Sequence, residues 1–288
     1  YTETDPVFSS SVAAGITGTD TTNWNNKLET EVDGSVTNEI QDLANVLAAG
    51  TDANSNNITN LADPVNDQDA VTKTYVDALI EKISELEILT TTFKDFDGNL
   101  YSAIKIGNQI WMAENLKTTH YANGDTIPDG SGEANISGQV DPEYWFAYNN
   151  DTNNVYTYGR LYTWYTVINS ANICPDGWRV PSDADWTQLT DYLGGPSIAG
   201  GKLKETGTTH WNSPNTGAIN ETGFTALPDG YRYFNGAFNY IGTYGYWWAS
   251  TELNASSAWN INMDYDNAGT KRSFNNKKFG LSVRCIMD

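Results

Sequence analysis

The sequence predicts an α+β protein in which a sheet-rich globular domain at 95–288 follows a fibrous stalk at 1–94. Three observations lead to this division. Nine of the ten tryptophans lie after residue 94, so the large apolar side chains that build a core are concentrated in the second part. Three short runs, 245–251, 258–266 and 279–286, have the two-residue period of strands. Apolar residues between 76 and 93 recur at the spacing of a coiled-coil helix.

The strand pattern is clearest just before residue 266. Apolar and polar side chains alternate there, with Trp259, Ile261 and Met263 on one side and Asn260, Asn262 and Asp264 on the other. The turn-forming run 267–269 separates this strand from the next one. We expect the polar side to face solvent on a rigid sheet, which describes a recognition surface better than a catalytic one.

Residues 57–77, which read NITNLADPVNDQDAVTKTYVD, resemble a repeat found in tail-fibre and collar proteins of phages and phage-like particles. In those proteins the repeat leads an extended segment into a helix. The apolar seam of a short coiled coil at about 70–93 follows it here, formed by Val76, Leu79, Ile83, Leu86 and Phe93.

The seam has two interpretations. A monomeric helix with one apolar stripe is the simpler one, but the polar residues before it offer little apolar material to cover the stripe. Self-association is therefore expected. Ile83 and Leu86 at core positions favour a dimer, whereas fibres of the resembled kind are generally trimers, and we expect a homotrimer.

Local signals predict several elements of the globular domain. Gly107 and Asn108 lie between two apolar runs, which is a hairpin signal. Residues 158–169 place apolar side chains on one helical face and predict a helix. Ser182 followed by Asp185 predicts the capped start of another helix.

The charge balance excludes two classes of partner. The net charge is −20, which disfavours binding to nucleic acid or to an anionic membrane surface. No run of about 18 apolar residues is present, so we expect no membrane insertion.

Cys174 and Cys285 are the only cysteines. They can form a disulfide, remain two buried thiols, or supply two ligands of a metal site. Neither His120 nor His210 lies at zinc-ligand spacing from a cysteine, which disfavours the metal. We expect the two cysteines to pair with each other.

Seven motifs carry a resemblance to a known family. They read DGNLY at 97–101, IGNQIWMAENL at 106–116, YGRLYTW at 158–164, CPDGWRVPS at 174–182, GFTALPDG at 223–230, WWAST at 247–251 and SVRC at 282–285. In this order they resemble the Fibrobacter succinogenes major paralogous domain, an extracellular module of bacteria and their phages. The resemblance implies a C-type-lectin-like fold, akin to the formylglycine-generating enzyme and to the variable proteins of diversity-generating retroelements.

We expect no enzymatic activity. The chain has no His-Glu-x-x-His, no Gly-x-Ser-x-Gly and no phosphate-binding glycine loop. Both cysteines lie in motifs that are structural in the resembled family, which implies no redox role like that of the formylglycine-generating enzyme. No cofactor is expected. Calcium is possible, but Trp259 and Asn260 match only the strand motif of calcium-dependent lectins, and their loop motif is missing.

A ligand-binding surface is predicted in the C-terminal stretch, where the resembled lectin folds carry their variable residues. It comprises Trp259, Asn260, Asn262, Asp264, Tyr265, Asp266, Arg272, Asn275 and Asn276. Such residue types give rigid aromatic area and adaptable hydrogen bonds. Five basic residues cluster nearby at 271–284, and we expect them to form a patch that attracts acidic sugars or an acidic protein loop. The alternative is that they only neutralise neighbouring carboxylates.

These features together predict the receptor-binding tip of a tail fibre of a phage or contractile injection particle. It would act outside the cell, bind a glycan or protein on a bacterial surface, and join an upstream fibre or baseplate protein. The alternative is a bacterial surface or secreted adhesin built from the same module. Baseplate, sheath and tube genes beside the gene would favour the fibre, and an upstream lipoprotein signal would favour the adhesin.

Overall fold

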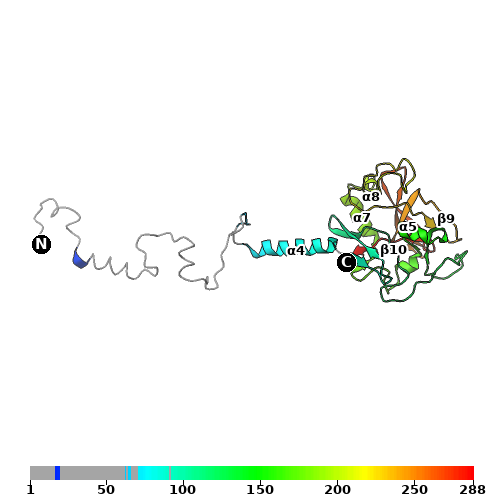
Figure 1. Cartoon of the computed structure of the whole chain (residues 1–288), viewed down its shortest axis with the longest axis horizontal. Helices are drawn as coiled ribbons and strands as arrows, with labels where there is room; N and C mark the ends of the chain where they lie inside the picture. Colours follow the sequence, from blue (N-terminus) through cyan, green and yellow to red (C-terminus); the bar gives the residue numbers. More distant parts are fainter. Residues whose placement is uncertain (1–16, 20–61, 63, 66–70, 91) are drawn as a thin grey trace, which may run out of the picture. The chain divides into compact units, whose positions relative to one another are not determined.

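The computed structural model describes residues 17–19, 62, 64–65, 71–90 and 92–288 (Figure 1). The chain divides into two compact units, residues 1–75 and 76–288. Of the predicted stalk, only short pieces and the segment from residue 71 onward fall within the described residues. Most of the tail-fibre-like repeat at 57–77 lies outside them.

Helix α4 (Lys73–Thr90) covers most of the predicted coiled-coil segment. The backbone N–H of Tyr75 donates to Thr72 Oγ1 at its start (3.1 Å), which is the bond of an N-cap residue. The helical seam residues Val76, Leu79, Ile83 and Leu86 are between 36% and 62% exposed in the single chain. The helix is thus present, and its pairing into a coiled coil stays a prediction.

Phe93, predicted as the last seam residue, lies outside the helix. It begins strand β1 (Phe93–Lys94), which pairs antiparallel with β2 (Leu100–Tyr101). Its ring packs edge-on against Trp178, with the ring centroids 4.9 Å apart. The expectation that Phe93 extends the helical seam is wrong, because strand pairing and contact with Trp178 draw it into the globular domain. That domain therefore begins with β1, just before residue 95.

The larger of two main sheets contains six strands. Their order across the sheet is β12 (Thr270–Asn276), β11 (Ser257–Asp264), β10 (Tyr244–Asn254), β13 (Leu281–Ser282), β6 (Leu161–Tyr162) and β5 (Trp145–Phe146). β10, β11 and β12 form an antiparallel meander, and β13 runs parallel to β10. The strands predicted at 245–251 and 258–266 and the turn that follows them are confirmed as β10, β11 and the connection to β12. The third predicted run, 279–286, contains only β13 and the first residue of β14, and β12 was not predicted.

The second sheet has four short strands. Their order is β3 (Ala103–Ile106), β4 (Gln109–Met112), β14 (Ile286–Met287) and β7 (Trp178–Arg179). β3 and β4 form the hairpin predicted at Gly107 and Asn108. β14 pairs antiparallel with both β4 and β7, so the last residues of the chain join segments that are far apart in the sequence. β8 (Tyr231–Arg232) and β9 (Phe238–Asn239) form a separate pair.

Short helices connect the strands. They are the 3₁₀ turn η2 (Tyr148–Asn150), α5 (Asn153–Tyr158), α6 (Trp164–Val167), α7 (Asp183–Tyr192) and α8 (Ala199–Leu203). The predicted cap of α7 is confirmed, since Ser182 and Asp185 form a reciprocal capping box. The single helix predicted over 158–169 is wrong. Strand β6 occupies its first half because Leu161 and Tyr162 pair with β5 and β13, and this long-range pairing overrides the local period.

The core lies on both faces of the β10–β12 meander. Trp247, Ile261 and Met263 belong to an apolar cluster that includes Trp186 and Leu189 of α7. We call this side of the meander the helix face. Trp248 and Ala258 belong to a second cluster, which includes Leu281 and both cysteines. We call that side the tyrosine face, for the residues described below.

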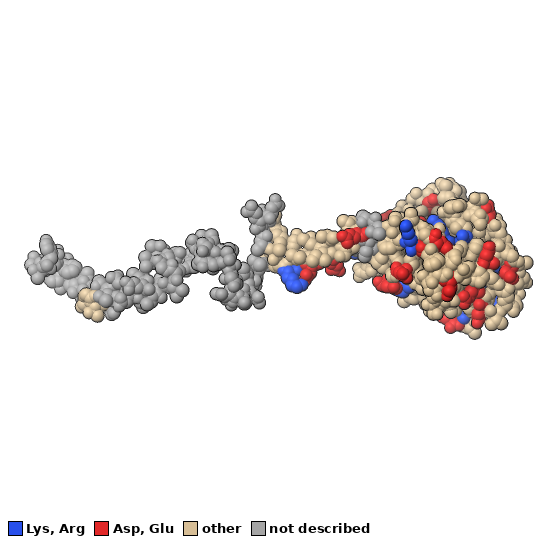
Figure 2. All heavy atoms as spheres, turned by 60° about the horizontal axis from the view of Figure 1, so that its bottom comes forward, with Lys and Arg blue, Asp and Glu red and all other residues tan. Residues whose placement is uncertain are grey.

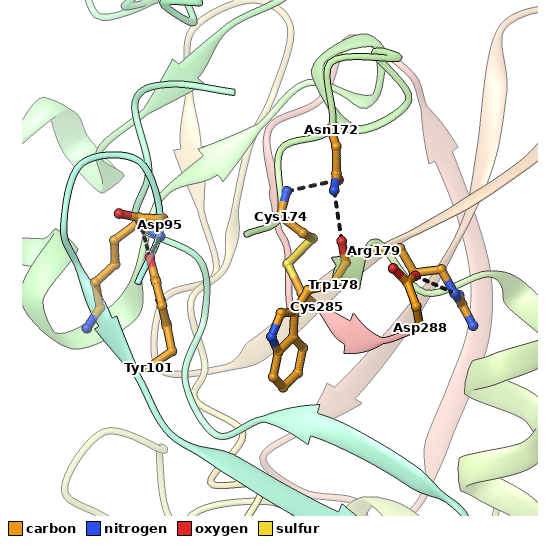
Figure 3. Close-up of a disulfide and its surroundings, with 9 residues drawn as sticks. Asp95, Tyr101, Asn172, Cys174, Trp178, Arg179, Cys285 and Asp288 are labelled. Atoms are coloured by element: carbon orange, nitrogen blue, oxygen red, sulfur yellow. Dashed lines mark hydrogen bonds and ion pairs between the residues drawn. A yellow bond between two sulfur atoms is a disulfide. The ribbon is translucent and has the colours of Figure 1, made fainter. Parts of the chain in front are cut away.

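The structure shows the expected disulfide between Cys174 and Cys285, which are 111 residues apart in the sequence (Figure 3). Asn172 holds the loop that carries Cys174. Its Oδ1 accepts from the backbone N–H of Cys174 at 3.1 Å, and its Nδ2 donates to the backbone carbonyl of Trp178 at 2.8 Å. The disulfide joins the loop before α7 to Cys285, the residue that precedes β14.

Asn115 connects the buried polar groups of the domain. Its Oδ1 accepts from Trp247 Nε1 at 2.8 Å and from Arg284 Nε and Nη2 at 3.0 and 2.8 Å. Its Nδ2 donates to Asp229 Oδ2 at 2.9 Å. Arg284 and Asp229 are buried. Burial raises the pKa of Asp229 to about 7 and lowers the pKa of Arg284 to about 9, as desolvation disfavours both charged forms.

Candidate binding surface

Strand register decides which of the predicted contact residues share a face, because residues paired across antiparallel strands point to the same side. The polar set pairs with aromatic residues of β10: Asn260 with Trp248, Asn262 with Tyr246 and Asp264 with Tyr244. All three polar residues are between 2% and 6% exposed. The expectation that they face solvent is wrong, because short polar side chains lie here beside bulky rings. Their role in binding stays a prediction.

Trp259 and Arg272 lie on the helix face, near the edge of the sheet. The guanidinium carbon of Arg272 is 3.3 Å from the centroid of the Trp259 ring. Arg272 Nε and Nη2 donate to the two carboxylate oxygens of Asp183, the first residue of α7, at 2.6 and 2.8 Å. A stacked, bidentate arginine is held in one orientation, so this predicted contact residue is already paired within the domain.

The basic residues at 271–284 do not form an open patch. Lys277 and Arg284 are buried. The others contact acceptors nearby: Arg272 pairs with Asp183, Lys271 lies 3.8 Å from Asp264, and Lys278 Nζ donates to the carbonyl of Ser137. Figure 2 shows basic side chains scattered among acidic ones on the face in view. The expectation of an open basic patch is wrong. The alternative, in which these residues pair with neighbouring groups, describes them better.

The other predicted contact residues lie at opposite ends of the meander. Tyr265 and Asp266 follow the end of β11, where Tyr265 packs partly against the helix-face cluster and Asp266 is exposed. Asn275 and Asn276 are half-buried and pair with the start of β11. The nine predicted residues therefore do not gather into one surface.

Four tyrosines form a continuous half-exposed surface on the other side of β10. Their rings make a closed set of contacts, with centroid separations of 5.5 Å for Tyr231–Tyr240, 5.3 Å for Tyr240–Tyr244, 5.8 Å for Tyr244–Tyr246 and 5.5 Å for Tyr231–Tyr246. We call these four residues the tyrosine surface. Tyr240 is 49% exposed, and the other three are half-buried.

The hydroxyl groups of three of these tyrosines stay protonated at neutral pH. Burial raises the pKa of Tyr231, Tyr244 and Tyr246 above the ordinary value for tyrosine. The Asp264 carboxylate adds to this shift at Tyr244 through charge and a hydrogen bond. The tyrosine surface therefore offers neutral hydrogen-bond donors between apolar ring faces.

Tyr240 is held in an unusual backbone conformation. Its φ is 69°, in the left-handed region that bulky side chains rarely adopt. The backbone N–H groups of Thr243 and Tyr244 both donate to the Tyr240 carbonyl, at 3.0 and 3.1 Å. Conformations of this kind cost free energy and occur often at ligand sites. The turn thus fixes the most exposed ring of the tyrosine surface.

None of the four tyrosines was among the predicted contact residues. One signal was present in the sequence, since Tyr244 and Tyr246 have the two-residue spacing of one strand face. Their contact with Tyr231 and Tyr240 depends on how the β8–β9 pair packs, which no local pattern encodes.

Within the described residues, no three His, Cys, Asp or Glu side chains gather as a metal site would require. No helix in the described part of the chain is both long and apolar enough to cross a membrane.

These features define a sheet-rich α+β domain with few helices, one disulfide and a half-exposed aromatic surface. The family model of the Fibrobacter succinogenes major domain matches residues 104–287, so the chain belongs to this family. The resemblance seen in the sequence motifs is thereby confirmed. No curated protein and no solved structure matches the chain.

Proposed function

We propose that the chain is the receptor-binding tip of a tail fibre of a phage or contractile injection particle, attaching it to a glycan or protein on a bacterial cell surface. The proposal includes a C-type-lectin-like fold, a location on the particle outside the cell, and binding rather than catalysis. The observation that carries it is the tyrosine surface.

Aromatic side chains at a surface suit attachment for physical reasons. A tyrosine offers a large contact area at a low cost in conformational entropy, because it has two side-chain torsions. Its ring face packs against the C–H groups of a sugar or of an apolar side chain, while its hydroxyl donates a hydrogen bond. Contiguous exposed aromatic area on a folded domain is typical of an interaction site.

Helix α4 supports the fibre part of the proposal. Its exposed stripe, Val76, Leu79, Ile83 and Leu86, is suited to pack against the same residues of further copies, and the trimer follows the resemblance to fibre proteins. We expect sedimentation of the intact chain to give three times the mass of 31.7 kDa. Ile83→Asp should convert it to a monomer, while Asp77→Asn should leave the mass unchanged. A monomeric wild-type chain would contradict the trimer.

The attachment test uses the fluorescently labelled intact chain on a panel of bacterial strains and on a glycan array. Tyr240→Ala combined with Tyr244→Ala should weaken attachment by tenfold or more, since aromatic anchors at an interface contribute about 2 kcal/mol or more each. The matched control is Tyr156→Ala, which removes a tyrosine that is 82% exposed on α5. All variants should keep a wild-type circular dichroism spectrum.

Equal attachment by the wild type and the double variant would contradict the proposed surface. The chain attaches to cells under both the fibre and the adhesin hypotheses, so its location distinguishes them. Finding the chain on the bacterial envelope, and not on purified particles, would favour the adhesin.

A further inference from the structure

A small cavity lies on the helix face of the meander, between α7 and the strands β11 and β12. Its volume is about 160 Å³, and its walls are mostly apolar. Trp186 of α7 and Ile261 of β11 provide large apolar side chains, and Asp183, Asp191 and Arg272 provide charged ones. The cavity shares no lining residue with the tyrosine surface.

Thr270 gives the cavity a polar group that the protein does not satisfy. Its side chain is 5% exposed, and its Oγ1 is buried without a hydrogen-bond partner in the protein. Pairing with Met263 places it on the helix face, with Ile261 and Arg272. A buried hydroxyl without a partner destabilises a fold, so a ligand that accepts its hydrogen bond would explain why it is there.

Two of the charged lining residues, Arg272 and Asp183, are fixed in place by contacts with each other and with Trp259. Arg272 stacks on Trp259 and binds both carboxylate oxygens of Asp183. Asp191 is exposed on α7. The cavity thus combines apolar walls and an unpaired hydroxyl with charged groups that can bind sugar hydroxyls. This arrangement fits a polar ligand that carries one short apolar group.

We propose that this cavity binds the acetamido group of an N-acetylated amino sugar. The methyl packs against Trp186 and Ile261, the carbonyl oxygen accepts from Thr270 Oγ1, and the ring hydroxyls lie near Asp183 and Asp191. Apolar cavities of about 150 Å³ hold a ring the size of benzene, so the space suffices. A purely apolar group would leave Thr270 unpaired, and a sugar without the acetamido group would put hydroxyls against apolar walls.

This assignment rests on the proposed function for the choice of a sugar, and it describes a second sugar site, separate from the tyrosine surface. The experiment is saturation-transfer difference NMR of the intact chain with N-acetylglucosamine, with glucosamine and glucose as matched sugars. The acetyl methyl protons should receive the strongest saturation, and the other two sugars should give little. Thr270→Val keeps the shape of the side chain and removes the hydroxyl. It should abolish the acetyl signal and hold or raise the melting temperature.

Tyr240→Ala should leave the acetyl signal unchanged, which separates the cavity from the tyrosine surface. Saturation absent in the wild-type chain, equal for all three sugars, or unchanged in Thr270→Val would overturn the assignment. A lower melting temperature in Thr270→Val would also count against it, because it would show that the hydroxyl is already satisfied. Cell attachment without an acetyl signal contradicts this inference alone, and an acetyl signal without cell attachment contradicts the proposed function alone.

Discussion

The two faces of the β10–β12 meander share one strand periodicity and end up in different environments. On the helix face, Trp247, Ile261 and Met263 pack beneath α7. On the tyrosine face, the outer end of β10 carries Tyr244 and Tyr246, which meet Tyr231 and Tyr240 and stay half-exposed. A two-residue period separates the side chains into two sets, and the elements packed against each set decide which one becomes buried.

The difference has a consequence for binding. A face covered by a helix presents little to a macromolecular partner beyond the small cavity at its edge. The other face, which carries aromatic rings at its surface, presents a broad area of ring faces and hydroxyl groups. We therefore assign attachment to the tyrosine face, although the polar residues between its rings are buried.

The largest expected effect on stability comes from removing the disulfide, which lies in the core on the tyrosine-face side of the meander. Replacing Cys174 and Cys285 together by alanine should lower the free energy of unfolding by roughly 4–5 kcal/mol, because the bond closes a loop of about 110 residues in the unfolded chain. Urea unfolding followed by tryptophan fluorescence measures this loss. A loss below about 1 kcal/mol would show that packing alone holds the two segments together.

The free energy of unfolding should fall by about 3–5 kcal/mol in Asn115→Ala, which acts on the helix-face side, because each buried donor left without an acceptor costs about 1–3 kcal/mol. The substitution removes the acceptor of Trp247 Nε1 and of Nε and Nη2 of the buried Arg284, whose Nη1 still donates to the Phe224 carbonyl. Urea unfolding measures the change. Asn123→Ala, in an exposed turn, is the control and should stay within about 0.5 kcal/mol of wild type. Similar losses in both variants would argue against the network.

A pH-dependent effect on stability is expected from Asp229, which accepts from the backbone N–H of Tyr246 at 3.0 Å. Burial raises its pKa to about 7, so the folded chain holds a proton that the unfolded chain releases near pH 4. Stability should therefore fall as the pH rises from about 4 to about 7. Thermal melts across this range should show the fall in the wild type and a flatter profile in Asp229→Asn. Identical profiles would mean that Asp229 is charged in the fold.

The smallest expected effect concerns the edge of the helix face. Arg272→Lys keeps the charge but loses the bidentate pair with Asp183 and the stacking on Trp259. The free energy of unfolding should fall by about 1 kcal/mol as a result. The difference should shrink in high salt, because the pair is partly exposed. A salt-independent loss would indicate that stacking, not the ion pair, dominates.

Local signals predicted the elements that depend on nearby residues. The capping box at Ser182, the hairpin at Gly107 and the strands β10 and β11 all follow from short-range chemistry and period. Three expectations failed where distant segments decide the outcome: Phe93 packs on Trp178, the first half of 158–169 pairs into the sheet, and Asn262 is buried between rings. The tyrosine surface was missed for the same reason, because Tyr231 comes from β8, Tyr240 from the turn after β9, and Tyr244 and Tyr246 from β10.

Tyrosine oxidation by hydroxyl radicals, read by mass spectrometry, tests the central claim most directly. It would compare the intact chain free and attached to bacterial cells selected from the strain panel. We expect Tyr240, which is 49% exposed, to lose most of its oxidation on attachment, with smaller losses at Tyr244 and Tyr246. Tyr156 on α5 should be oxidised equally in both states. Protection at Tyr156 with none at Tyr240 would place the attachment surface elsewhere on the domain and contradict the assignment to the tyrosine face.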